Sequence, residues 1–99
     1  MIFVAFLKWT DQGARNPKDS IKRNQGAKSI AEKLGGKLIS SYVLSGGDHN
    51  VVAITDMPNG EAMAKLAAAI MATGNAHVSV MRGFTPEEFA TFASDVPTP

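Results

Sequence analysis

The sequence predicts an α+β fold in which an antiparallel sheet of four strands carries two helices on one face, with a short third helix at the end. Three observations predict it. Apolar runs typical of strands alternate with stretches that have the period of helices. Glycines separate these segments. The chain has 99 residues, of which 44% are hydrophobic and 19% charged, as in one globular domain.

The first third of the chain predicts a strand followed by a helix. Residues 2–9 are apolar at both odd and even positions, which is typical of a strand buried on both faces. Residues 10–16 are polar and include a glycine, so they predict a loop. The helix begins either at Pro17 with Asn16 as its cap, or after a cap at Asp19. Its apolar stripe is Ala27, Ile30, Ala31 and Leu34, and it ends at Gly35 and Gly36.

The middle of the chain predicts a hairpin. Residues 37–44 alternate poorly, with apolar side chains at both parities. Residues 45–48 read Ser-Gly-Gly-Asp and form the turn, and residues 50–55 are again apolar on both faces.

The last part of the chain predicts helix, strand and helix. Asn59 caps a helix over residues 60–73, and residues 76–83 form the fourth strand. Thr85 and Glu88 have the spacing of a capping box with a proline between them, so a short helix begins there. Residues 95–99 predict a frayed tail. The buried stripe of the earlier helix is Met63, Leu66, Ala67 and Ile70.

This order is the ferredoxin-like βαββαβ arrangement with an added C-terminal helix, over a single domain spanning residues 1–99. Two helices cover only one face of the sheet, yet the first and third strands are apolar on both faces. An exposed patch of this size is typical of an interface. We therefore expect a homodimer or higher homo-oligomer in which two sheets close on each other. The alternative is that the third helix or the tail folds back over this face.

Composition excludes several classes of function. There is no cysteine, so disulfides, thiolate metal sites and cysteine nucleophiles are absent. The net charge of +1 argues against a nucleic-acid-binding protein. Residues 1–40 hold eight basic and three acidic side chains (net +5), and the rest holds two basic and six acidic ones (net −4). A solvated helix face explains this asymmetry, and weak anion binding at the start of the first helix is the alternative.

No targeting or membrane segment is expected. The apolar run over residues 2–7 is too short for a signal peptide, and no stretch approaches the roughly 20 apolar residues of a membrane helix. We therefore expect a cytoplasmic protein without a membrane partner.

Four residues are candidates for a ligand-binding cleft at the strand ends: Trp9, Tyr42, His49 and Arg82. Trp9 offers a flat apolar surface with one donor, and it can equally plug a sheet edge or an interface. The imidazole of His49 is the candidate acid or base, against the alternative of a turn residue facing water. The spacing of His49 and His77 matches no metal motif, so we predict neither a metal nor a cofactor.

The sequence also resembles a known family. The segments Lys8-Trp9-Thr10-Asp11-Gln12-Gly13, Lys18-Asp19-Ser20 and Ala31-Glu32-Lys33-Leu34-Gly35-Gly36 resemble the GYD-domain family of small bacterial proteins, and the likeness spans nearly the whole chain. It implies a ferredoxin-like fold related to the dimeric α/β barrels, and it implies no known activity. Where the family has its Tyr-Asp pair, this chain has His49 and Asn50 after Gly47 and Asp48.

The leading hypothesis is a homo-oligomeric domain that binds a small molecule in a cleft at the strand ends or the subunit interface. The main alternative is an oligomerisation module without a ligand. By analogy of fold, a cofactor-free oxygenase is a further alternative, in which His49 would be the acid or base.

Overall fold

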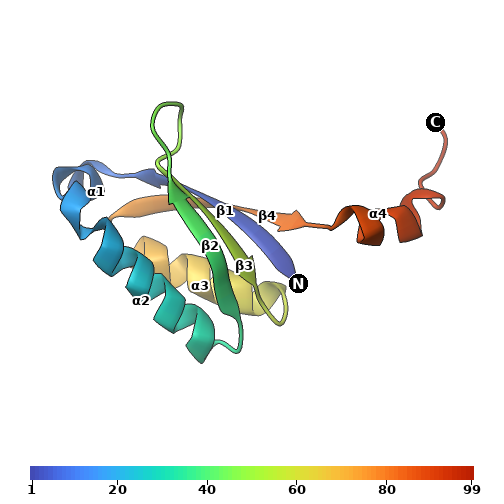
Figure 1. The fold of residues 1–99 in the computed structure, drawn as a ribbon, viewed down its shortest axis with the longest axis horizontal. Helices are drawn as coiled ribbons and strands as arrows, with labels where there is room; N and C mark the ends of the chain where they lie inside the picture. The colour runs from blue at the N-terminus through green and yellow to red at the C-terminus, as the bar shows by residue number, and fades with distance from the viewer.

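The computed structural model describes residues 1–99 and contains one sheet with helices on one side (Figure 1). The strands are β1 (Ile2–Trp9), β2 (Lys37–Val43), β3 (Val51–Asp56) and β4 (Ala76–Gly83). The helices are α1 (Asp11–Arg15), a 3₁₀ turn η1 (Pro17–Asp19), α2 (Ser20–Lys33), α3 (Gly60–Ala72) and α4 (Pro86–Ala93).

The sheet has the strand order β2-β3-β1-β4, and every neighbouring pair is antiparallel. Helices α2 and α3 both lie on the same face of this sheet (Figure 1). The ferredoxin-like arrangement predicted from the sequence is therefore confirmed, with α4 as the added C-terminal helix.

The closely packed core lies where β1 begins. Phe3, Met57, Met63 and Leu66 are at most 8% exposed and belong to one cluster. Thr55 is the buried polar residue beside them. Its hydroxyl has two acceptors within reach, the carbonyl oxygen of Phe3 at 3.4 Å and the sulfur of Met63 at 3.3 Å, so its single proton is not left unpaired. Few other side chains are fully buried, so the packing is uneven along the sheet.

The predicted loop over residues 10–16 is wrong, because α1 forms there. Thr10 caps this helix by accepting a hydrogen bond from the N–H of Gly13 at 3.1 Å. Gly13 is needed for close packing rather than as a helix breaker, since a Cβ at this position would lie 2.0 Å from the carbonyl oxygen of Asn75. The amide of Gln12 ties the same turn to the carbonyl oxygen of Thr73 at 3.0 Å.

Two ambiguous features of the sequence have structural explanations. Both predicted starting positions appear, because Pro17 opens the 3₁₀ turn and α2 begins after Asp19. Neither Asn16 nor Asp19 makes a side-chain capping hydrogen bond. The poor alternation of β2 comes from a register shift between Leu38 and Ser40, which leaves Ile39 out of the pairing with β3.

The sheet face away from the helices is uncovered. We call it the open face. Strand pairing gives it an apolar centre with the following side chains: Ile2, Val4, Phe6, Tyr42, Val52, Ile54 and Met81. The same strand pairing places polar side chains, among them Lys8 and Asp56, around that centre. Helix α4 does not fold back over this face but leads away from the sheet beyond the end of β4 (Figure 1). No helix of the chain is long and apolar enough to cross a membrane.

Candidate functional site

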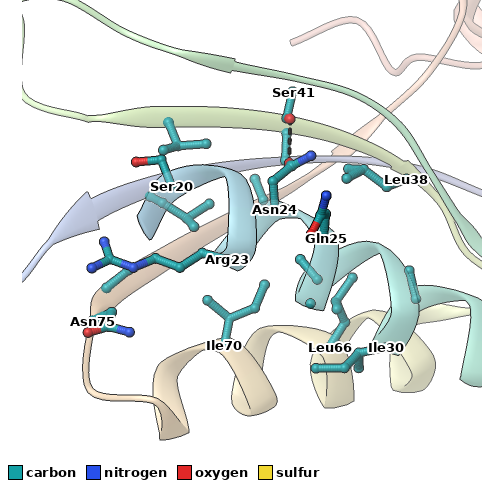
Figure 2. A pocket seen from close by; sticks show the side chains of 18 of the residues that line it. Ser20, Arg23, Asn24, Gln25, Ile30, Leu38, Ser41, Leu66, Ile70 and Asn75 are labelled. Atoms are coloured by element: carbon teal, nitrogen blue, oxygen red, sulfur yellow. Dashed lines mark hydrogen bonds between the residues drawn. The ribbon is translucent and has the colours of Figure 1, made fainter. Parts of the chain in front are cut away.

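A cavity of about 490 Å³ lies between the sheet and the helices α2 and α3 (Figure 2). It extends from the buried side chains of Met63 and Leu66 to Trp9, Thr73 and Asn75 at the far end of β1. The well-packed core therefore occupies one end of the sheet–helix layer, and the cavity occupies the other.

Small residues on facing elements explain the empty space. Ala5 and Ala53 pair with each other on the helix-facing side of β1 and β3. Gly26 and Ala27 face them from α2, and Ala69 from α3. None of these side chains extends beyond a methyl group, so they do not fill the space between the sheet and the two helices.

The wall of the cavity is apolar and its rim is polar. Ile30, Leu66 and Ile70 project into the space from the two helices (Figure 2). At the rim, the hydroxyl of Ser41 on β2 donates to the side-chain oxygen of Asn24 on α2 at 2.6 Å. This hydrogen bond links the helix to the edge strand across the opening (Figure 2).

The mouth of the cavity is lined by solvent-exposed apolar side chains. Ile21 of α2 is 74% exposed and Val43 of β2 is 62% exposed, and both line the cavity. The space is therefore open to solvent between α2 and β2.

One charged residue, Arg23, lines the cavity. Its two terminal nitrogens donate to the backbone carbonyl oxygens of Gly13 at 3.0 Å and Asn16 at 3.1 Å. The guanidinium group thereby holds the α1 segment against α2. A ligand that enters the cavity therefore meets an apolar wall, neutral polar groups at the rim and one guanidinium that is held on backbone carbonyl oxygens.

The four predicted cleft residues do not meet within one chain. Trp9 lines the cavity, and its backbone N–H donates to the side-chain oxygen of Asn50 at 2.8 Å. Tyr42 borders the cavity on β2, while strand pairing with Val52 puts its side chain on the open face.

His49 and Arg82 lie outside the cavity. The His49 ring packs against Phe6 on the open face, with ring centroids 5.4 Å apart, and no hydrogen bond orients it. Arg82 pairs with Phe3 at the far end of β1 from Trp9, and its guanidinium lies 4.3 Å from the ring centroid of Phe84. A catalytic role for His49 stays a prediction, as does a cleft shared by all four residues.

Both carboxyl groups with a shifted pKa also lie outside the cavity. The Met1 ammonium, 2.9 Å from Asp56, lowers the pKa of that carboxyl group. The backbone N–H of Thr85, which donates to Glu88, lowers the pKa of the Glu88 carboxyl group. No group of three or more His, Asp or Glu side chains is placed to hold a metal ion. The cavity itself offers shape, apolar surface and neutral hydrogen-bonding groups.

Sequence reasoning missed most of the cavity residues, including Asn24, Ser41 and Asn75. The sequence signal that could have revealed the cavity was the set of small residues on both long helices and both central strands, namely several alanines and Gly26. Their facing arrangement becomes visible only when the sheet register and the helix rotations are known.

Comparison with protein families gave one match: the GYD domain, over residues 3–93. Because the match covers most of the chain, the chain belongs to the GYD domain family, in agreement with the resemblance of its motifs. Comparison with curated proteins gave no match.

Proposed function

We propose that this member of the GYD domain family binds an uncharged, mainly apolar small molecule between its sheet and its two long helices. The observation that carries the proposal is the cavity of about 490 Å³ in a chain of only 99 residues. Pockets that hold small ligands have volumes of about 300 to 1,000 Å³ and are mostly apolar, with a few polar groups that fix orientation.

The chemistry of the lining selects the ligand class. Water gains few hydrogen bonds against Ile30, Leu66 and Ile70, so an apolar ligand that displaces it is favoured. The guanidinium of Arg23 keeps its positive charge, but it is held on the carbonyl oxygens of Gly13 and Asn16 and is directed away from Ile30 and Leu66 (Figure 2). A charged group placed among the apolar side chains would therefore lose its hydration without a counter-ion beside it. Asn24 and Ser41 at the rim can exchange their mutual hydrogen bond for one to a hydroxyl or carbonyl of the ligand.

A matched pair of fluorescent probes tests this selection. Phenylnaphthylamine is uncharged and apolar, and anilinonaphthalene sulfonate adds a sulfonate to nearly the same skeleton. We expect saturable binding of phenylnaphthylamine with a fluorescence increase, and at least about tenfold weaker binding of the sulfonate, because burial of an unpaired charge is costly. Equal or tighter binding of the sulfonate would contradict the proposal.

Neighbouring alanines of α3 locate the probe. Ala69 lines the cavity, whereas Ala68 is exposed and does not. We expect Ala69→Leu to fill part of the space and abolish phenylnaphthylamine binding, while Ala68→Leu binds like the wild type. If both variants bind equally, the probe lies elsewhere, with the open face as the first place to look.

Self-association through the open face is a second candidate function, and it is compatible with the first. It is supported by the seven apolar or aromatic side chains that strand pairing gathers there without a covering element. Tyr42 and His49 lie on this face, so a second copy is what would bring them into an enclosed site.

A further inference from the structure

Asn75, which lines the far end of the cavity, has a side-chain amide whose orientation is fixed by its neighbours. Nε2 of Gln12 donates to the carbonyl oxygen of Thr73 at 3.0 Å. The same nitrogen donates to the side-chain oxygen of Asn75 at 2.9 Å. An NH₂ group cannot accept such a bond, so the oxygen of Asn75 faces Gln12 and its NH₂ group faces the other way. In Figure 2 this nitrogen lies on the side of Ile70, which also lines the cavity.

The turn that carries this amide is held by hydrogen bonds on both sides. The backbone N–H of Thr10 donates to the carbonyl oxygen of Asn75 at 3.0 Å, and the Thr10 hydroxyl donates to that of Gly74 at 2.6 Å. The N–H of Asn75 donates to the hydroxyl of Thr73 at 3.2 Å. The amide is therefore positioned before any ligand arrives, and such a group loses little conformational freedom on binding.

The free hydrogen-bonding groups at this end of the cavity are donors. The NH₂ group of Asn75 has no acceptor within the chain, and neither has the indole N–H of Trp9, which lines the same end. The carbonyl oxygens of Thr73, Gly74 and Asn75, by contrast, each already accept a hydrogen bond. No Asp or Glu lines the cavity. A ligand group at this end therefore gains most if it is an acceptor.

We propose that Asn75 binds the carbonyl oxygen of an uncharged carbonyl compound, such as a ketone or an ester, whose apolar body lies against Ile70 and Leu66. The inference rests on the ligand binding proposed above, and it adds the chemical class of the ligand and its orientation. Arg23, the one cationic residue of the lining, is held on backbone carbonyl oxygens, which favours a neutral carbonyl over a carboxylate.

The amide of Asn24 at the mouth of the cavity is the alternative anchor. Its oxygen accepts from Ser41, so its NH₂ group is also free. Asn24 is exposed, however, whereas Asn75 is half-buried. A hydrogen bond at the mouth replaces one to bulk water, while a donor inside the cavity has fewer water molecules to bind, so Asn75 discriminates more strongly between ligands.

Two naphthalene compounds of nearly the same shape test the hydrogen bond in the full-length chain. 2-Acetylnaphthalene has a carbonyl group, and 2-isopropenylnaphthalene has a CH₂ group in place of the oxygen. Displacement of phenylnaphthylamine gives the affinity of each. We expect Asn75→Asp to lower the ratio of ketone affinity to alkene affinity at least about fivefold. The substitution keeps an oxygen that accepts from Gln12 and replaces the donor that faces the ligand by an acceptor.

Asn50→Asp is the matched control. The side-chain oxygen of Asn50 accepts from the backbone N–H of Trp9 near the same end, but Asn50 does not line the cavity. The control adds the same charge, so we expect an unchanged affinity ratio. An equal fall of the ratio in Asn50→Asp would overturn the inference, because charge alone would then explain the effect. A fall in Asn24→Asp but not in Asn75→Asp would also overturn it and place the carbonyl at the mouth.

A second measurement uses the chain without substitutions. In ¹⁵N–¹H spectra we expect the side-chain NH₂ signals of Asn75 to shift more with the ketone than with the alkene, because only the ketone accepts a hydrogen bond. A bound ketone that leaves these signals in place would overturn the role of Asn75 and leave the cavity as the binding site. Failure of phenylnaphthylamine and both naphthalene compounds to bind would overturn the proposed function itself.

Discussion

Gly13 and Gly26 have the same side chain and opposite surroundings. At Gly13 an added Cβ would meet the backbone of Asn75, whereas at Gly26 it would meet nothing within 4 Å outside its own helix. The sequence placed Gly13 in a loop because its neighbours are polar, and it placed Gly26 in a helix because an apolar stripe follows it. It does not show what either glycine faces in the folded chain. This is why residues 10–16 predicted a loop and the structure has α1.

The contrast predicts opposite effects of the same substitution. We expect Gly13→Ala to lower the free energy of unfolding by about 1 to 3 kcal/mol, because backbone atoms must move to admit the methyl group. Gly26→Ala should raise it by about 0.5 to 1 kcal/mol, because alanine loses less backbone entropy in a helix interior. Urea denaturation of both variants measures the difference, and a stabilised Gly13→Ala would contradict the packing described here.

The candidate site residues show what single residues can and cannot reveal. Trp9 was chosen for its aromatic surface at a strand end, and it does line the cavity. Tyr42, His49 and Arg82 were chosen for aromatic or titratable side chains near strand ends. The strand register, however, determines the face on which Tyr42 and Arg82 lie. The register of β2 depends on the shift that leaves Ile39 unpaired, and the register of the other strands depends on partners far away in the sequence. The local sequence does not indicate either.

At the scale of elements, the strands, the two long helices and α4 were predictable because each has a local signal. Asn59 caps α3 by accepting a hydrogen bond from the N–H of Ala62 at 2.8 Å, and Thr85 forms the predicted capping box of α4. The direction of α4 was not predictable, because its own sequence does not indicate whether the helix packs on the open face or leads away from the sheet.

The capping box of α4 predicts a pH dependence. The pKa of Glu88 is lowered in the folded chain, so its contribution to α4 is complete above the ordinary value of 4.5. The contribution is lost as the pH falls through the lowered folded-state pKa. We expect the ¹³Cα shifts of residues 86–93 to move toward random-coil values in this acidic window.

Two substitutions isolate the carboxylate. Glu88→Gln keeps an oxygen that can accept from the N–H of Thr85 but cannot titrate, so α4 should lose this pH dependence. Glu87→Gln changes the neighbouring carboxylate, which makes no capping bond, and should behave like the wild type. If Glu87→Gln removed the pH dependence instead, the assignment to the capping box would be wrong.

At the scale of the whole molecule, the apolar residues on both faces of β1 and β3 predicted an uncovered surface, and the structure has one. The cavity on the other face was not predicted. It arises from alanines on separate helices and strands and from one glycine, Gly26, and each of them is an ordinary helix or strand residue in its own segment.

The open face predicts concentration-dependent association. We expect Ile54→Lys, near the centre of this face, to abolish dimers in sedimentation velocity, because a buried unpaired ammonium is costly. Met71→Lys changes a 44% exposed apolar residue on α3 and should associate like the wild type. Dimers that persist in Ile54→Lys would exclude the open face as the interface.

The most direct test of the central claim is to locate phenylnaphthylamine by nuclear Overhauser effects to assigned methyl groups. We predict contacts from the aromatic protons of the ligand to the methyl groups of Ile30, Leu66 and Ile70, which line the cavity. Contacts confined to Val4, Val52 and Ile54 on the open face would contradict it and show that the sheet–helix cavity is not the binding site.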